Sequence, residues 1–372
     1  MEGAGQMRTI LISGEWLWPH YQEACAKALE SIGHTTIKFG WYQHFFSVSP
    51  GKEPRFRSFI AQRQNKYVAG PLISKINHDF LSVATENKPD VVWMYNDTHI
   101  VPGTIKRLRK LLPKTLFAQY ANDNPWAPNQ SAFKWRHFKK SVSLFDINFY
   151  YRLSNKLDLL RAGAKRTELL RSYYIPQETF PVERRLIEDE FRSDVVFVGH
   201  YEDDGRLAML SAIAETGCKL RLFGTGWNAH LARLPVGHVL KGLYPVTPVR
   251  GKDYRKAICG SRMALSFLSK LNEDTYTRRN FEIPAMKTFM LSEHSDDLAN
   301  LFAEGIEAEF FRSKDELLSK IDHYLRHDAE ITRLAARGYE RITKDGHDVV
   351  TRMKQFSDRI DQTAKEGVCA ES

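Results

Sequence analysis

The fold class is decided by residues 194–223, DVVFVGHYEDDGRLAMLSAIAETGCKLRLF. Asp194 to His200 is a short apolar run typical of a buried strand, Arg206 to Thr216 has the spacing of a helix, and Lys219 to Phe223 is apolar again. A glycine turn at Gly224 to Gly226 follows. Strand, helix and strand in this order predict a parallel sheet covered by helices.

The same alternation begins the chain. Thr9 to Ser13 (TILIS) predicts a strand, and an amphipathic stretch after it ends at Gly33. Asp90 to Tyr95, Pro102 to Leu112 and Thr115 to Tyr120 repeat strand, helix and strand. The N-terminal half therefore predicts a doubly wound sheet of its own.

Further elements complete the second half. Met263 to Leu268 and Thr288 to Leu291 predict buried strands, and Ser313 with Glu316 forms a capping box that opens a helix. Between Ile175 and Arg192 the polar sequence IPQETFPVERRLIEDEFR contains two prolines and breaks the pattern. We expect the connection between the two halves to lie there.

At 372 residues the chain exceeds what one core usually organises, which favours two domains. The predicted boundaries are 1–178 for an N-terminal domain and 190–345 for a C-terminal domain. A terminal helix at 346–366 is expected to pack back toward the N-terminal domain.

The formal charge of +9 predicts a surface that attracts anions: nucleotide phosphates, an anionic lipid surface or nucleic acid. The four cysteines have no metal-ligand or CxxC spacing, and neither a signal peptide nor a membrane-spanning run is evident. We therefore expect a cytoplasmic protein, with peripheral contact at the inner membrane face as a further expectation.

The densest group of candidate site residues opens the predicted helix before the strand at Thr288. Paired arginines at a helix N-terminus suit a diphosphate, and a carboxylate one turn later can accept hydrogen bonds from ribose hydroxyls. The alternative is a structural pair between Arg279 and Glu282, three residues apart on the helix surface. The candidates of this segment for binding a diphosphate and its ribose are Thr277, Arg278, Arg279, Asn280, Phe281 and Glu282.

The runs TRRNFEIPAMKTFMLSEHSDDLANLF, SKDELLSKIDHYL, RLAARGYERI and HDVVTRM resemble the CgeB-type group 1 glycosyltransferases. The resemblance covers roughly Asp194 to Arg352. It implies a GT-B fold, in which two Rossmann-like, doubly wound lobes face each other across a cleft, and a nucleotide-sugar donor. The residues that carry it are Arg279, Phe281, Glu282, Ala285, Glu293, His347 and Arg352.

The resemblance also implies individual roles. Glu282 would hold the ribose, and Arg278 or Arg279 the diphosphate. The first loop, with Gly199, His200 and Arg206, would face the phosphates, and the second, with Gly224, Thr225 and Trp227, the base or the sugar. Two positions depart from the family pattern: Asp274 stands where related retaining enzymes have glutamate, and Lys287 where glycine is common.

Acceptor-binding candidates lie at strand ends of the N-terminal half: Glu15, Trp16, Trp18, His20, Asn96 and Asp97. Aromatic faces stack on sugars, whereas packing of both tryptophans in the core is the alternative. Asp123 is a candidate to orient or deprotonate an acceptor hydroxyl, or else forms an Asx turn. His99 is a third catalytic candidate beside Asp123 and Asp274, with a structural role as its alternative.

With the C-terminal domain binding the donor and the N-terminal domain the acceptor, the resemblance implies a metal-independent glycosyltransferase, without cofactor, that moves a sugar from a nucleoside diphosphate to an acceptor hydroxyl, with retention favoured. Expected partners are the nucleotide sugar and an acceptor glycan, lipid-linked saccharide or other hydroxyl-bearing acceptor. Two alternatives are a sugar-nucleotide epimerase on the same fold and a nucleic-acid-binding protein, including one with modified DNA as acceptor.

Overall fold

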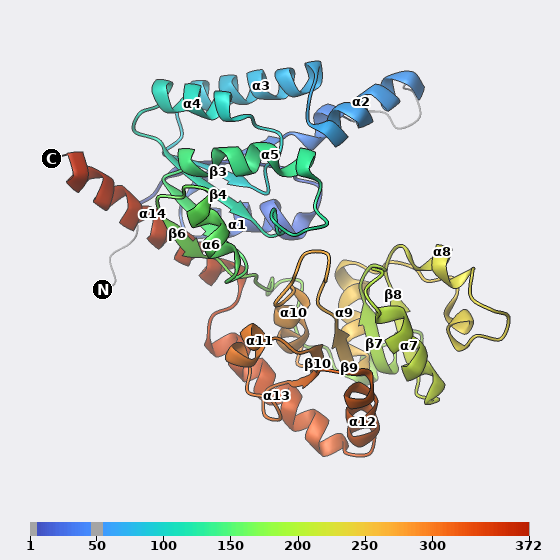
Figure 1. Ribbon diagram of the computed structural model, residues 1–372. Helices are drawn as coiled ribbons and strands as arrows, with labels where there is room; N and C mark the ends of the chain where they lie inside the picture. The colour runs from blue at the N-terminus through green and yellow to red at the C-terminus, as the bar shows by residue number, and fades with distance from the viewer. Residues whose placement is uncertain (1–5, 46–54, 372) are drawn as a thin grey trace. The chain divides into compact units, whose positions relative to one another are not determined.

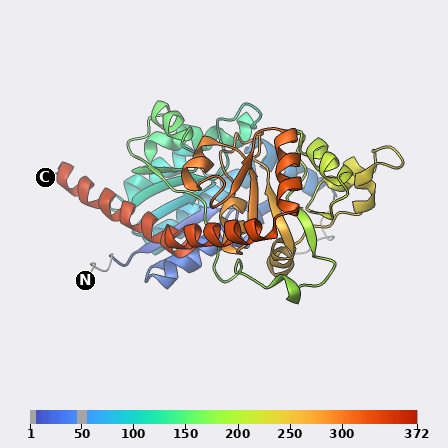
Figure 2. The ribbon, with the colours of Figure 1, turned by 90° about the horizontal axis from the view of Figure 1, so that it is seen from below.

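The structure, a computed structural model, describes residues 6–45 and 55–371. Contacts divide the chain into two compact units. The first runs up to Arg171 and resumes at Val349; the second is Ser172–Asp348 (Figure 1). The helix α14 (Val349–Glu371), which ends at the label C in Figures 1 and 2, therefore belongs to the N-terminal unit.

The first unit contains a six-stranded parallel sheet of order β2-β1-β3-β4-β5-β6. The order reverses between β1 and β3, and such a switch point is where open parallel sheets bind ligands. The strands are β1 (Thr9–Gly14), β2 (Thr35–Gly40), β3 (Val91–Tyr95), β4 (Leu116–Ala121), β5 (Ile147–Tyr150) and β6 (Thr167–Leu169).

Helices cover both faces of this sheet. On one face, Ile76 and Phe80 of α3 and Leu108 of α4 pack on Val92 and Phe117 of the strands. On the other, Phe356 of α14 stacks against Trp93 and Phe149, with ring centroids 4.3 and 5.0 Å apart. The helices are η1 (Pro19–Glu23), α1 (Ala24–Ser31), η2 (Tyr42–Phe45), α2 (Arg55–Tyr67), α3 (Pro71–Asn87), α4 (Pro102–Leu111), α5 (Ala132–Ser141), η3 (Val142–Leu144) and α6 (Asn155–Arg161).

Strand β2 and helices α2 and α3 were not among the predicted elements. β2 is an edge strand whose first four residues are exposed or half-buried, so its sequence TTIKFG shows little apolar pattern. Helix α3 did carry a signal, because Ile73, Ile76 and Phe80 are buried at helical spacing.

The second unit contains a five-stranded parallel sheet of order β11-β10-β9-β7-β8. Its switch point lies between β7 and β9. The strands are β7 (Ser193–Val198), β8 (Leu220–Phe223), β9 (Ser261–Ser266), β10 (Phe289–Glu293) and β11 (Glu309–Phe311). The helices are η4 (Arg184–Leu186), α7 (Arg206–Glu215), α8 (Trp227–Leu231), η5 (Val239–Leu243), α9 (Gly251–Cys259), α10 (Arg279–Ala285), α11 (Asp296–Leu301), α12 (Lys314–Leu325) and α13 (Asp328–Lys344).

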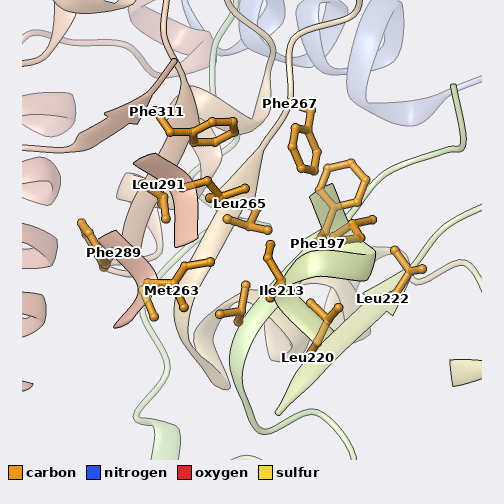
Figure 3. Packing of buried hydrophobic residues seen from close by; sticks show 14 of the residues in the cluster. Phe197, Ile213, Leu220, Leu222, Met263, Leu265, Phe267, Phe289, Leu291 and Phe311 are labelled. Atoms are coloured by element: carbon orange, nitrogen blue, oxygen red, sulfur yellow. The ribbon is translucent and has the colours of Figure 1, made fainter. Parts of the chain in front are cut away.

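The core of the second unit follows from the strand register. Phe197 pairs with both Leu222 and Leu265, and Leu265 pairs in turn with Leu291, so four apolar residues line up across the sheet. Figure 3 shows these side chains packed with Phe267 and others above the strands. The fully buried sheet explains why the strands appear in the sequence as apolar runs without alternation.

The polar segment expected to connect the domains lies inside the second unit. Ile187 and Phe191 are buried there, and Arg184 Nε donates a hydrogen bond to the Gly260 carbonyl at 3.0 Å. The prolines and charges of residues 175–192 thus belong to an ordered loop on the surface of that unit.

The capping box predicted at Ser313 is present. Ser313 Oγ accepts the Glu316 backbone N–H at 3.1 Å, which satisfies one of the donors at the start of α12. The Glu316 carboxylate returns to the backbone N–H of Arg312 at 2.7 Å. Among the described residues, no helix combines the length and the apolar composition needed to cross a bilayer.

Candidate functional site

The candidate donor site lies at the carboxyl edge of the second sheet. Because all five strands are parallel, the loops that follow β7, β8, β9 and β10 meet at this edge. The loops after β9 and β10 enclose a hollow of about 350 Å³. It is lined by Leu268, Ser269, Lys270, Glu273, Asp274, Glu293, His294 and Ser295.

Helix α10 holds Glu282 beside a tyrosine and an arginine. Glu282 is only 3% exposed; it accepts a hydrogen bond from Tyr254 Oη at 2.7 Å and pairs with Arg278 at 3.2 Å. Burial, together with the Glu282 charge, raises the pKa of Tyr254 far above its usual range, so the phenol remains a hydrogen-bond donor. The carboxylate is therefore held from two sides, by a neutral phenol and by a guanidinium.

The partner of Glu282 is Arg278, one helical turn away, and no ion pair between Glu282 and Arg279 occurs. Arg279 is directed elsewhere: its guanidinium lies over the ring of Phe197, with Cζ 5.7 Å from the centroid. Its Nε is buried and has no hydrogen-bond partner among the described residues. A buried cationic donor without a partner is costly unless a ligand completes it, so Arg279 is the strongest anion-binding candidate of this edge.

Three other candidates of this segment serve the packing of α10. The Asn280 side-chain oxygen accepts the Thr277 N–H at 2.8 Å, and its amide nitrogen donates to Ser292 Oγ at 3.0 Å. Phe281 is fully buried and lies edge-on to Tyr276. Asn280 thus fixes the helix to β10, and Thr277 and Phe281 are engaged in packing; direct contact of the three with the donor stays a prediction.

The first loop is organised by Arg206, which is 2% exposed. Its guanidinium donates to both carboxylate oxygens of Asp204 and to the carbonyl of His200 at 2.8 Å. The predicted phosphate contact is therefore corrected, since this guanidinium is used within its own loop. The Gly199 N–H donates to the Phe223 carbonyl at 2.9 Å, so Gly199 shapes the loop, and His200 follows it beyond the carboxyl end of β7.

Glu202 was missed from the sequence. It is buried, accepts a hydrogen bond from Ser269 Oγ at 2.7 Å and pairs with His200 Nε2 at 2.7 Å. Burial raises the pKa of Glu202, but hydrogen bonds from His200 and Ser269 and the charge of Arg206 outweigh burial and lower it overall. Glu202 thus joins the loop after β7 to the loop after β9, a link between distant segments that no local pattern indicates.

The loop after β8 meets the loop after β7 through backbone contact. Gly224 has φ +146°, and a Cβ there would lie 1.9 Å from the Gly199 carbonyl oxygen. Trp227 is fully buried and its Nε1 donates to that same oxygen at 2.8 Å. Trp227 therefore supports the loop from beneath, which corrects its predicted contact with base or sugar; Thr225 is exposed beside it.

The two departures from the family pattern have distinct environments. Asp274 lines the hollow and is half-buried, with its N–H bonded to the Ser269 carbonyl at 2.9 Å. Lys287 is exposed and has φ +54°, a left-handed conformation that glycine adopts without strain. This conformation is a physical reason for the glycine that is common at that position.

The N-terminal unit gathers charges at the carboxyl ends of β1, β3 and β4. Asp123 accepts a hydrogen bond from the Asn96 amide at 3.4 Å and pairs with Lys134 Nζ at 3.6 Å. Burial raises the pKa of Glu15, Lys134 opposes that shift, and Asp123 adds to it. Glu15, Asn96 and Asp123 are thus brought together at the switch point of this sheet.

The aromatic candidates of the first loop are half-buried. Trp16 donates from Nε1 to the Ile12 carbonyl at 3.2 Å, and Lys38 lies over its ring. Trp18 and His20 stack with centroids 6.1 Å apart. All three keep part of their surface accessible beside Glu15, so a role in acceptor binding remains a prediction.

His99 is buried in the packing of the N-terminal unit. Its ring stacks on Trp41 at 3.7 Å, and its two nitrogens contact Thr98 Oγ1 and Asn65 Oδ1 at 3.0 Å each. Burial lowers the pKa of His99 to about 3. Both nitrogens are occupied and the ring stays neutral, which argues against catalysis by His99 and favours the structural alternative.

Asp97 is buried next to His99. One oxygen accepts the His99 and Ile100 backbone N–H groups at 3.0 and 3.2 Å, and the other accepts the Ser13 hydroxyl. Burial raises the pKa of Asp97 to about 6. At 1% exposure it positions the loop after β3, and the predicted acceptor contact is corrected to this supporting role.

Substitution of Asp97 should change how stability depends on pH. The folded-state pKa lies above the unfolded value, so the folded chain binds the extra proton and Asp97 contributes less stability as pH rises from about 4 to about 6. Asp97→Asn should remove this loss, which is on the order of 2–3 kcal/mol. Unfolding in urea at pH 4 and at pH 7 should show the variant gaining on wild type at the higher pH; a constant difference would contradict the assignment.

One cluster has the residue types of a metal site. His323, His327 and Glu330 place possible ligand atoms within 4.8 Å of one another at the end of α12 and the start of α13. Their contacts are satisfied within the chain, since His323 Nε2 lies 3.2 Å from Glu330 and His327 Nδ1 donates to the His323 carbonyl at 2.6 Å. The cluster belongs to a helix junction and contributes nothing to the candidate donor site.

Comparison with known proteins supports the fold and finds one family resemblance in the C-terminal half. Residues 206–358 match the family described as glycosyl transferase-like. Sucrose-phosphate synthase from Thermosynechococcus elongatus superposes with a TM-score of 0.70 at 12% identity, covering 98% of this chain and 100% of that one. No curated protein matches the chain in sequence.

Two further structures agree with this result. Anabaena HepE in complex with UDP and glucose gives a TM-score of 0.65 at 12% identity, covering 95% of this chain and 100% of that one. A glycosyltransferase from Rickettsia africae gives 0.64 at 12% identity, covering 97% and 99%. The predicted GT-B fold is confirmed. The match to the glycosyl transferase-like family covers residues 206–358, and the CgeB type stays a prediction.

Proposed function

We propose that this chain is a glycosyltransferase whose C-terminal unit binds a nucleoside diphosphate sugar. The observation that carries the proposal is that one short helix holds both an oriented Glu282 and an Arg279 whose buried Nε has no hydrogen-bond partner among the described residues. A nucleoside diphosphate can bind both residues. Its two ribose hydroxyls can donate hydrogen bonds to the Glu282 carboxylate, and its phosphate oxygens can accept hydrogen bonds from Arg279.

In the proposed complex the Glu282 carboxylate accepts the ribose hydroxyls, and Arg279 donates to the diphosphate. The backbone at His200 faces the phosphates from the loop after β7, and Gly199 shapes that loop through its hydrogen bonds to Phe223 and Trp227. As the bond to the sugar breaks, negative charge grows on the leaving diphosphate, and a fixed guanidinium stabilises that charge more than it stabilises the ground state. These residues provide this stabilisation without a bound metal ion, as proposed from the sequence.

We assign acceptor binding to the N-terminal unit, where Asp123 lies within 3.4 Å of the Asn96 amide and 3.6 Å of Lys134. A carboxylate held in this way can orient an acceptor hydroxyl and take up its proton. Retention of the anomeric configuration is the proposed outcome, with Asp274 in the hollow beside the sugar. Its shorter side chain reaches less far than the glutamate of related enzymes.

A thermal-shift screen tests the donor site. UDP and UDP-glucose are the first ligands to use, since the Anabaena neighbour was crystallised with UDP and glucose; GDP, ADP, CMP and dTDP and their sugar conjugates complete the set. A diphosphate at 100 times its dissociation constant should add about 2.7 kcal/mol to the free energy of unfolding. Glu282→Gln, which keeps the shape but loses the charge, should abolish most of this stabilisation.

The matched control is Tyr254→Phe, which removes only the hydroxyl that orients Glu282. It should reduce the response modestly, because the Arg278 contact to Glu282 remains. A flat response to every nucleotide by folded wild-type protein would refute the donor site. Incubation with the donor alone separates an epimerase, which forms a new sugar nucleotide, from a transferase, which does not.

A further inference from the structure

Three neighbouring helices of the N-terminal unit contain many cations and no acids. Helices α2, α4 and α5 each carry four Lys or Arg and no Asp or Glu. Residues 55–144, which include them, hold 15 Lys and Arg against 5 Asp and Glu, a net charge of +10, whereas the whole chain carries +9. The positive charge of the protein is therefore concentrated in one segment.

Helices α2 and α5 pack against each other, α4 packs against α5, and with α3 they form the layer on one face of the sheet (Figure 1). Six of the cations whose side chains the structure describes are exposed to solvent. Arg109 is paired with Asp146 and Lys134 with Asp123, but the structure shows no ion pair for the others whose side chains it describes. The exposed cations of the three helices are Arg63, Lys66, Lys106, Arg107, Lys110 and Lys140.

Apolar side chains stand among these cations on α2 and α5. Phe59, Ile60 and Phe133 are 52%, 40% and 50% exposed. Phe133 contacts Tyr67 edge-on at 5.2 Å, and the Arg63 guanidinium lies 4.8 Å over the ring of Phe59. Large apolar groups therefore stand beside cations at the junction of α2 and α5. We call these three apolar residues, together with the exposed cations of α2, α4 and α5, the basic face.

We propose that the basic face binds the surface of an anionic lipid bilayer. Exposed lysines and arginines are attracted by acidic headgroups, while phenylalanine and isoleucine side chains beside them enter the boundary between headgroups and acyl chains. Nucleic acid would satisfy the cations and could stack on the two phenylalanines, but it offers nothing to the aliphatic Ile60. The combination of free cations with both aromatic and aliphatic exposure favours lipid.

The position of the face has a consequence for the acceptor. Phe133 is followed directly by Lys134, which contacts Asp123, the residue assigned to the acceptor hydroxyl. A bilayer at the basic face would therefore bring the headgroups of lipid-linked saccharides close to Asp123. This choice of acceptor class rests on the proposed function, whereas membrane binding itself does not.

Vesicle cosedimentation tests the proposal with the full chain. Phosphatidylcholine vesicles containing roughly 30% phosphatidylglycerol should bind the wild type, and pure phosphatidylcholine vesicles should not. Arg63→Glu with Lys66→Glu should weaken binding about tenfold or more, because each basic group near an anionic surface contributes attraction. Phe59→Ser with Phe133→Ser should weaken the part of the binding that persists at high salt.

Lys156→Glu with Lys165→Glu is the matched control, since both lysines are exposed on the same unit outside the basic face and the charge change is identical. If the control lost as much vesicle binding as the variant of the basic face, net charge alone would explain the loss and the proposal would be overturned. Failure of the wild type to bind anionic vesicles would also overturn it, as would tight binding of single-stranded DNA that the phenylalanine substitutions leave unchanged. The nucleotide-induced thermal shift should be the same in all variants, so loss of the shift in wild type would count against the donor site alone.

Discussion

Gly224→Ala is expected to destabilise the protein by about 3–5 kcal/mol or to prevent its folding. The added Cβ would lie 1.9 Å from the Gly199 carbonyl oxygen and 2.6 Å from its carbon, far inside van der Waals contact. That same oxygen accepts the Trp227 indole N–H, so it cannot move away without leaving a buried donor unsatisfied. The φ of +146° adds backbone strain for any side chain.

Gly217→Ala provides the matched control. Gly217 also has a positive φ, +81°, but no heavy atom within 4 Å of an added Cβ. Gly217→Ala should lower the free energy of unfolding by about 1–2 kcal/mol, which is the cost of placing alanine in a left-handed conformation. Urea unfolding followed by far-UV circular dichroism measures both; similar losses for the two variants would show that backbone strain, and not the close approach of the two loops, governs this position.

Arg279→Met is expected to weaken binding of the nucleoside diphosphate by about 100-fold or more, and transfer by a similar factor. Methionine fills the space over Phe197 but offers no donor to the diphosphate. The unliganded protein should be as stable as wild type or more so, because the variant removes a buried Nε that has no partner. On this expectation, Arg279 lowers the stability of the unliganded protein and strengthens its binding of the nucleoside diphosphate.

Calorimetric titration with UDP and with UMP measures this effect, since the loss should be greater for the diphosphate. Arg337→Met is the control: Arg337 lies on α13, exposed and paired with Glu340, and its loss should affect neither ligand. If Arg279→Met instead lowered the stability of the free protein and left UDP affinity intact, Arg279 would be a packing residue of Phe197.

The outcomes at Arg206 and Arg279 show where sequence reasoning reached its limit. Both arginines follow a strand and open a helix, so the sequence suggests the same phosphate-binding role for each. In the structure Arg206 is consumed by Asp204 and the His200 carbonyl, whereas Arg279 Nε has no partner. Whether an arginine is available to a ligand depends on the neighbours that folding brings to it.

The sequence by itself determined the parallel α/β class, the presence of two doubly wound sheets and the capping box at Ser313. These features follow from local patterns, because buried strands, helix faces and caps are specified by residues a few positions apart. Helix α3 was equally readable from its apolar spacing and was missed.

The tertiary structure alone decided which polar residues are hydrogen-bonded within the fold and which buried groups have no partner among the described residues. Tyr254 and Glu282 are 28 residues apart, and Glu202 and Ser269 are 67 apart, yet each pair forms a hydrogen bond of 2.7 Å. His99 could be recognised as structural only once its ring was seen stacked on Trp41. Burial and hydrogen-bond partners are properties of the packed chain, and side chains distant in sequence acquire them only when the strands are placed side by side.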